Sequence, residues 1–296
     1  MGKAERNRAR TARERIAAQQ DAARRAEQRR KLLIAGGSVA LVLVVLAALL
    51  IVKSLIKPGK QLGSGNLPAG VVHDITHVPA STLATIGTGA LPATGLPLKA
   101  ISDKALTGAG KPEMLYIGAE YCPFCAAMRW SMAVALSRFG TFGPLNGIHS
   151  SSTDVFPNTP TLTFYKQRYS SPYLTFTPVE NEDGHHKLLQ QTTKSQYALW
   201  RKYDYSSSGL GYPFIDFGNK VVVTGPLYGP QVLRGASGKP LTWAQVAGQL
   251  KDPNSTVAKN VNGAANYITA SICKMTDNKP ATVCTAAPIP AIESKL

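Results

Sequence analysis

One uncharged apolar run constrains this 296-residue chain more than any other feature. Residues 32–52 form a stretch of 21 residues in which Ser38 is the one polar side chain. As a helix rising about 1.5 Å per residue, it would reach about 31 Å, the thickness of a bilayer's hydrocarbon core. A helix buried in a water-soluble core would show a polar stripe, and this run shows none. The run therefore predicts a transmembrane helix.

A cleavable signal peptide is the alternative interpretation of the same run. The apolar region of a signal peptide is usually about 7–15 residues long and ends at a small-x-small cleavage site. Here the run is longer, and the four residues from Val52 to Leu55 offer no such site. We therefore expect an uncleaved anchor.

The distribution of charge predicts the orientation of this anchor. The chain carries 33 Lys and Arg against 17 Asp and Glu, a net charge of +16. Residues 1–31 alone hold 11 basic and 4 acidic side chains, whereas Lys53, Lys57 and Lys60 are the basic residues soon after the run. By the positive-inside rule, the N-terminus is expected in the cytoplasm and residues 53–296 outside.

The basic segment 1–31 has two further interpretations. Its arginine pairs resemble a twin-arginine export signal, although the positive-inside rule, which places basic residues on the cytoplasmic side of a membrane helix, explains them as well. We expect the segment to form a cytoplasmic helix against anionic headgroups. Because it contains no aromatic residue that could stack on a base, no nucleic-acid partner is expected.

The exported part divides into a linker and a domain. Residues 53–72 are rich in Gly, Pro and Ser and predict a flexible linker. Residues 73–296 alternate helical and strand patterns, which predicts an α/β fold with a central mixed sheet and helices on both faces. The expected helices are 81–86, 123–139, 193–203, 242–251 and 255–275, and the expected strands are 114–119, 162–165, 174–179, 214–217 and 220–224.

Cys122 and Cys125 form a C-x-x-C motif that follows a predicted strand and opens a predicted helix. Unpaired backbone N–H groups and the helix dipole lower the pKa of a thiol at such a position. Pro123 suits the first helical turn because its missing N–H has no partner to lose there. We therefore expect Cys122 to act as the nucleophile and Cys125 as the resolving thiol, a reaction that needs no cofactor.

Other roles for the cysteines stay open. The motif could be half of a zinc site, but a second C-x-x-C and nearby histidines are lacking, so no metal is expected. It could also be a purely structural disulfide. Cys273 and Cys284 lie eleven residues apart, and an even cysteine count outside the cell favours pairing. We expect them to form a structural disulfide that fastens the C-terminal tail to the last helix.

The motif carries a resemblance to known families. The run from Ala119 to Cys125, AEYCPFC, resembles the AEWCGPC active-site turn of the thioredoxin superfamily. Tyr212-Pro213, which precedes a predicted strand, resembles that superfamily's cis-proline strand. The resemblance implies a thioredoxin-like fold, a cis Tyr212–Pro213 bond and a substrate groove shaped by Pro123, Phe124, Tyr212 and Pro213.

Three further runs resemble a more specific family. They are Ile117–Trp130, Ser137–Gly140 and Phe156–Thr161. They look like the membrane-anchored thioredoxin-like proteins of actinobacteria and archaea that share domain of unknown function 929. The function of that family is not established.

One position departs from the thioredoxin pattern. Efficient thioredoxins carry a buried carboxylate six residues before the first cysteine, where it assists proton transfer to the inner thiol. In this sequence that position is Tyr116, and Glu120 is expected to point from the wrong side of the strand end. The protein therefore lacks the carboxylate that usually transfers a proton during fast reduction of substrates.

The sequence thus predicts a membrane-anchored extracytoplasmic thiol-disulfide exchange protein. Its substrates would be thiols and disulfides of exported proteins, and a membrane redox partner would recycle Cys122 and Cys125. The direction of exchange depends on reduction potential and partner, so it stays open. A non-catalytic thioredoxin-like scaffold with a static disulfide is the alternative. A thiol carrier for copper or for haem maturation is a third hypothesis.

Overall fold

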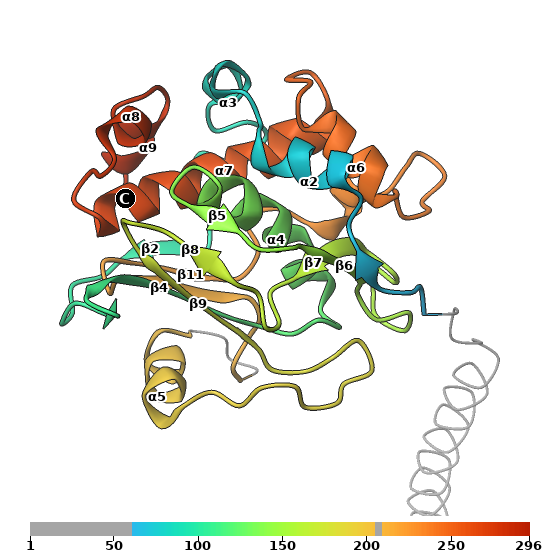
Figure 1. Ribbon diagram of the computed structural model, residues 1–296, viewed down its shortest axis with the longest axis horizontal. Coiled ribbons are helices and arrows are strands. Elements are labelled where there is room, and N and C mark those ends of the chain that lie inside the picture. Colours follow the sequence, from blue (N-terminus) through green and yellow to red (C-terminus); the bar gives the residue numbers. More distant parts are fainter. Residues whose placement is uncertain (1–60, 205–208) are drawn as a thin grey trace, which may run out of the picture. The chain divides into compact units, whose positions relative to one another are not determined.

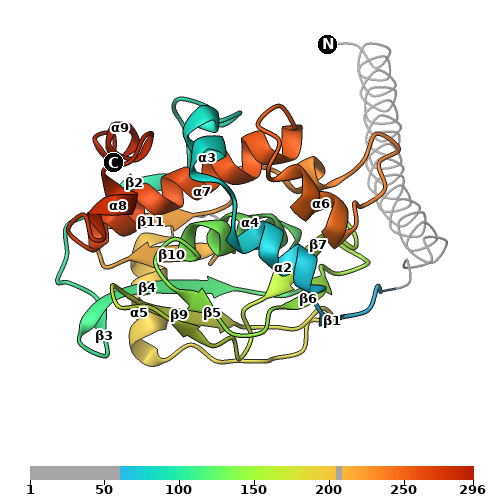
Figure 2. The same cartoon turned by 45° about the horizontal axis from the view of Figure 1, so that its top comes forward.

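The computed structural model of the protein describes residues 61–204 and 209–296. Its main sheet is built around β4 (Lys111–Gly118), the strand that leads to the C-x-x-C motif. β4 pairs antiparallel with β10 and parallel with β9, so the sheet is mixed. β11 and then β2 extend it beyond β10, and β3 pairs with the start of β4 (Figures 1 and 2). The bounds are Leu98–Ala100 for β2, Thr107–Gly108 for β3, Thr175–Glu180 for β9, Phe214–Phe217 for β10 and Val221–Thr224 for β11.

Alternating residues of β4 build two hydrophobic cores, one on each face of the sheet. Met114 and Tyr116 belong to the larger core, whereas Leu115 and Ile117 belong to the smaller one. This separation follows from the two-residue period of a strand, which points successive side chains to opposite faces. Because both faces are buried there, residues 114–118 of β4 form a continuous apolar run in the sequence.

Helix α4 (Pro123–Leu136) lies between the sheet and α7 (Thr256–Met275), as Figures 1 and 2 show. Every residue of α4 except Phe124 is buried. A helix that is apolar on all sides is expected in such a position. The C-x-x-C motif therefore begins a helix that packs against the sheet on one side and against α7 on the other.

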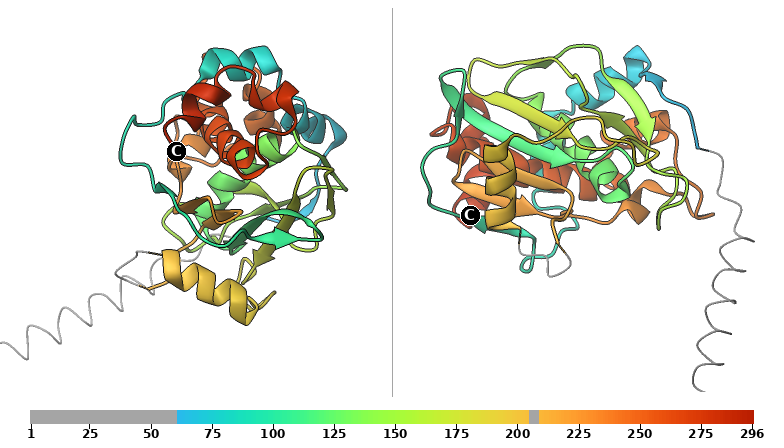
Figure 3. Two further views of the ribbon diagram at one scale, coloured as in Figure 1. Left: turned by 90° about the vertical axis from the view of Figure 1, so that its left-hand side faces the viewer. Right: turned by 90° about the horizontal axis from the view of Figure 1, so that it is seen from below.

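The opposite face of the sheet is covered by α5 (Lys194–Tyr203), which Figure 3 shows on the side away from α7. Its Trp200 and Tyr203 pack on the smaller core. Thr193 begins the helix with a capping box, in which its side chain and that of Gln196 each accept a backbone hydrogen bond.

The remaining elements surround this centre. A three-stranded sheet has the order β1-β6-β7, and β5 pairs with β8. The strand bounds are Gly65–Asn66 for β1, Thr141–Phe142 for β5, Asn146–His149 for β6, Pro160–Thr163 for β7 and Tyr169–Ser170 for β8. The helix bounds are Ala69–Thr76 for α2, Ala80–Ile86 for α3, Pro230–Leu233 for the 3₁₀ helix η1, Trp243–Gln249 for α6, Ala281–Cys284 for α8 and Ile289–Glu293 for α9.

The mixed sheet flanked by helices confirms the expected α/β architecture. The hairpin is also confirmed, because Gly218 and Asn219 both have positive φ between β10 and β11. The expected strand 162–165 lies two residues earlier, as β7. The linker prediction is wrong for residues 61–72, since β1 and the start of α2 lie there and Leu67 and Val71 are buried.

The predicted membrane anchor falls outside the described part of the chain. Residues 1–31, the apolar run 32–52 and the linker up to residue 60 all belong to the ranges that are not described. Among residues 61–204 and 209–296, no helix combines the length and the apolar character needed to cross a membrane.

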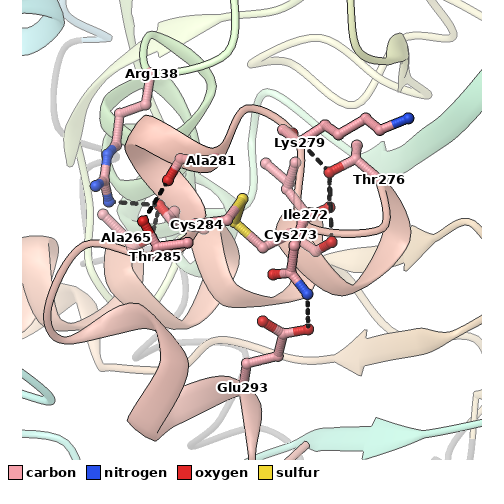
Figure 4. The surroundings of a disulfide bond; sticks show 12 residues. Arg138, Ala265, Ile272, Cys273, Thr276, Lys279, Ala281, Cys284, Thr285 and Glu293 are labelled. Carbon is pink, nitrogen blue, oxygen red and sulfur yellow. Dashed lines mark hydrogen bonds between the residues drawn. A yellow bond between two sulfur atoms is a disulfide. The ribbon is translucent and has the colours of Figure 1, made fainter.

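Cys273 of α7 and Cys284 of α8 form a disulfide, as predicted (Figure 4). Both residues are buried. Nearby, the Thr276 hydroxyl donates to the carbonyl oxygen of Lys279, and the Asn278 amide donates to Glu293. Closing a loop of this length stabilises the folded chain by about 3 kcal/mol in the loop-entropy account.

A buried carboxyl on β10 gives the stability of the domain a pH dependence. Asp216 is 0% exposed, its Oδ1 accepts the Asn219 N–H at 2.6 Å, and its Oδ2 has no hydrogen-bond partner among the described residues. Burial raises the pKa of Asp216 from 3.8 to about 7. Between these two values the folded state holds a proton that the unfolded chain has lost, so stability falls as the pH rises from 4 to 7.

We expect Asp216→Asn to remove this loss, because the amide keeps the Oδ1 acceptor and carries no charge. Above pH 7 the variant should be more stable by about 2 to 4 kcal/mol, and below pH 4 it should match the parent protein. Urea unfolding over this pH range measures the difference. A variant that is less stable than the parent protein at pH 8 would contradict the assignment.

Candidate functional site

The two cysteines of the motif lie at the first turn of α4. Cys122 is the N-cap residue, and its Sγ accepts the backbone N–H of Cys125 at 3.3 Å. Pro123 occupies the start of the helix, as the sequence predicts. Both thiols are free; Cys122 is 6% exposed and Cys125 is 0% exposed. The outer thiol is therefore the one that solvent reaches.

The surroundings shift the pKa values of the two thiols in opposite directions. Hydrogen bonding from the Cys125 side chain, with further help from backbone N–H groups and from the charge of Arg129, lowers the pKa of Cys122 against the effect of burial. Burial raises the pKa of Cys125 well above its usual value. Cys122 is thus the thiol that is more readily ionised, and ionisation is what makes a thiol nucleophilic.

A buried ion pair lies beneath the motif. Arg129 of α4 and Glu180 at the end of β9 are both fully buried and form two hydrogen bonds, at 2.8 and 2.6 Å. Arg129 also donates to the carbonyl oxygen of Ala119, at 2.7 Å, in the turn that leads to Cys122. The pair joins α4 and β9 to the turn 119–122, and the Arg129 charge acts on both thiols.

Aromatic side chains surround the cysteines. Tyr121, Phe124 and Tyr212 pack against a cluster formed by Ala119, Cys122 and Cys125. The Tyr212–Pro213 bond is cis, as the family resemblance implies, and it precedes β10, whose Phe214 pairs with Ile117. The predicted groove residues thus lie together at the strand end beside the cysteines.

Further aromatic contacts extend this cluster outward. The ring of Tyr212 stacks on Trp200 at 5.2 Å between centroids, and the ring of Phe124 meets Phe156 edge to face at 6.1 Å. The neighbouring Val155 side chain is 71% exposed. The rim beside Cys122 therefore presents apolar surface to solvent.

Hydrogen bonds join the loop that carries Val155 and Phe156 to the turn 119–122. The Ser151 N–H donates to the carbonyl oxygen of Tyr121 at 2.9 Å. Gln61, the first described residue, donates to the carbonyl oxygens of His149 and Ser150 and accepts the Ser152 N–H. The segment before β1 therefore supports the loop next to Cys122.

The carboxylate of Glu120 is held by a residue outside the motif. It accepts a hydrogen bond from the Thr163 hydroxyl, and burial raises its pKa. It lines a hollow of about 380 Å³ together with His149 and Asp183. Within residues 61–204 and 209–296, no group of three or more His, Cys, Asp and Glu side chains is arranged to hold a metal ion.

Sequence reasoning missed the role of Arg129 and Glu180. The signal was present, because Arg129 is the one charged residue in a helix rich in Ala, Met and Leu, and Glu180 ends an otherwise uncharged strand. A charge in such surroundings is rarely buried unless it is paired. The pairing itself joins residues 51 positions apart, and the local pattern does not show it.

Comparison with known proteins gives one match. Neither the curated proteins nor the solved structures contain a protein that matches the chain significantly. A family model described as a domain of unknown function, DUF929, matches residues 98–274. This range covers β2 through most of α7 and includes Cys122, Cys125, Arg129, Glu180 and the Tyr212–Pro213 bond. The chain therefore belongs to the DUF929 family.

Proposed function

We propose that this protein exchanges thiols and disulfides with exported proteins through Cys122 and Cys125. Cys122 forms the mixed disulfide with the substrate, and Cys125 resolves it. A membrane redox protein then returns the pair to its starting state, so that the protein can act again. The direction of net exchange follows from the reduction potential of the pair and from that partner.

The observation that carries this proposal is the difference between the two thiols. Cys122 caps α4, accepts a backbone N–H and has a lowered pKa, whereas Cys125 is fully buried and has a raised pKa. A purely structural pair has no need of such a difference. A more exposed, more readily ionised thiol next to a fully buried one is the arrangement that disulfide exchange requires.

The arrangement of elements supports a thioredoxin-like fold within the family. β4 leads into the C-x-x-C turn and α4, β9 lies parallel to β4, and the antiparallel hairpin of β10 and β11 follows the cis Tyr212–Pro213 bond. The apolar rim at Val155 and Phe156 offers a surface for an extended polypeptide beside Cys122. These features suit protein substrates better than small thiols.

Trapping of mixed disulfides tests this function. In cells that express Cys125→Ser, the resolving thiol is missing, so substrates should stay attached to Cys122 and appear as slower bands on non-reducing gels. Reducing agent should remove those bands, and the double variant with Cys122→Ser should never form them. Absence of trapped species, together with an unalkylated Cys122 after mild reduction, would contradict the proposal.

A second candidate is a non-catalytic envelope scaffold. Its support is the exposure of Cys122, which at 6% is low for a thiol that meets protein substrates. Under this function the Cys122–Cys125 pair would serve as a static bond, and Cys125→Ser would leave the envelope proteins untrapped. The trapping experiment therefore separates the two candidates.

We also propose that residues 32–52 anchor the protein in the cell membrane, with the N-terminus in the cytoplasm and the folded unit outside. The support is the length and apolar character of the run and the excess of basic residues before it. The protein should remain with membranes in alkaline carbonate. Protease added outside spheroplasts should digest the C-terminal domain, and its protection there would contradict the orientation.

A further inference from the structure

The resolving thiol shares a small space with the Tyr116 hydroxyl. Tyr116 and Gly118 point to the same face of β4, and the tyrosine side chain extends over the glycine. A Cβ added to Gly118 would lie 2.1 Å from the Tyr116 hydroxyl oxygen and 3.1 Å from Cys125 Sγ. Both atoms therefore border the volume that this glycine leaves open, and a larger residue at position 118 would push them apart.

The position of the Tyr116 ring is fixed by its neighbours. The ring meets Phe164 edge to face at 5.7 Å, and the Arg129 guanidinium carbon lies 6.0 Å from its centroid. The side chain is 0% exposed. The hydroxyl is therefore held in place before any substrate arrives.

The Tyr116 hydroxyl has no hydrogen-bond partner among the described residues. Buried tyrosine hydroxyls normally find one, because leaving such a group unpaired is costly. The cost is offset if the hydroxyl gains a partner during the reaction. Cys125 is the reactive group at the same place, and its sulfur becomes a strong acceptor when it ionises.

Among the described side chains near Cys125, Tyr116 offers an uncommitted hydroxyl donor, in addition to the backbone hydrogen bond at Ala119 that favours the Cys125 thiolate. The Glu180 carboxylate is occupied by Arg129, whose charge favours the Cys125 thiolate from a distance. Cys122 is the other titratable group that acts directly on Cys125. Burial raises the pKa of Tyr116 well above its usual value, so the phenol keeps its proton and donates.

We infer that Tyr116 is a catalytic residue of the resolving step, in which its hydroxyl donates a hydrogen bond to the Cys125 thiolate. This inference rests on the exchange function proposed above and adds a group to its site.

In the mixed disulfide, Cys125 first loses its proton to water. Its thiolate then attacks Cys122 Sγ, so the Cys122–Cys125 bond forms and the bond from Cys122 to the substrate sulfur breaks. The substrate sulfur leaves as a thiolate and takes a proton from water, while the cysteine pair is oxidised by two electrons and the substrate disulfide is reduced.

Stopped-flow reaction of the reduced, full-length protein in detergent with 5,5′-dithiobis(2-nitrobenzoate) separates the two steps. Attack by Cys122 releases the first coloured thiolate, and attack by Cys125 on the mixed disulfide releases the second. In Tyr116→Phe the second phase should slow by about 10- to 100-fold, the effect of losing one hydrogen bond to a charged group. The first phase should keep its rate, and the pH midpoint of the second phase should rise.

Tyr228→Phe is the matched control. Tyr228 is another buried tyrosine on the same core, but its hydroxyl donates to the carbonyl oxygen of Ala127 in α4. Its variant loses a buried hydrogen bond away from the thiols, so both phases should keep their rates.

Two results would overturn the inference. A second phase of equal rate in Tyr116→Phe and the parent protein would show that Cys125 does not use the hydroxyl, and equal slowing of both phases would show a general effect on folding. Absence of the first phase in the parent protein is a different failure. It would overturn the proposed exchange function, and the inference with it.

Discussion

We expect Glu180→Gln to lower the free energy of unfolding by about 3 to 5 kcal/mol, because it leaves the buried Arg129 charge without its counter-ion. Both side chains are 0% exposed, and Glu180 also accepts the Phe164 N–H. Burial alone would lower the pKa of Arg129, and the Glu180 charge raises it well above its usual value. Urea denaturation of the variant and the parent protein measures the change.

The double variant Arg129→Met with Glu180→Met is the control for this prediction. It removes both charges and keeps most of the buried volume, so part of the lost stability should return. If Glu180→Gln costs less than about 1 kcal/mol, the ion pair does not hold α4 and β9 together as described.

The second large effect concerns catalysis. We expect Cys122→Ser to reduce disulfide exchange with a model dithiol peptide to the uncatalysed background, because a hydroxyl at this position neither ionises near neutral pH nor forms a disulfide. Peptide oxidation followed by mass spectrometry measures the loss. The folded state should persist, since serine is a favoured N-cap residue.

Replacing Cys273 and Cys284 by serine gives the control for this loss. These cysteines form the disulfide between α7 and α8 and belong to no part of the candidate site. The double variant should be less stable but should retain exchange at temperatures where it stays folded. If this variant loses exchange and Cys122→Ser retains it, the chemistry belongs to Cys273 and Cys284, and the assignment to Cys122 and Cys125 is wrong.

The parts of the fold that depend on local signals could be predicted from the sequence. Cys122-Pro123 marks the start of α4, Gly218-Asn219 marks the hairpin, and Thr242 and Ser255 cap α6 and α7. In each case the signal lies within a few residues of the element it determines.

The parts that depend on distant contacts could not be predicted. β1 is two residues long and exists because Gly65 and Asn66 pair with β6, some eighty residues later. The Gly- and Pro-rich composition of residues 53–72 therefore predicts a linker, whereas β1 and the start of α2 lie within residues 61–72. Short strands such as β5 and β8 carry too few residues to show a periodic pattern.

The candidate site divides in the same way. The sequence singled out Cys122 and Cys125 because their spacing and their place before a helix have a chemical meaning. It treated Tyr116 as a missing carboxylate, whereas the structure brings its hydroxyl to the space beside Cys125. The closeness of the Tyr116 hydroxyl to Cys125 depends on how the tyrosine side chain extends over Gly118, and the sequence alone does not show this.

The pH dependence of Cys122 alkylation tests the central claim most directly. After mild reduction, iodoacetamide should label Cys122 and spare Cys125, with mass spectrometry reading each site. The account predicts that labelling of Cys122 reaches half its maximal rate at a pH below that of a free thiol, about 8.5. A Cys122 that stays unlabelled near neutral pH, or that titrates above that value, would contradict it.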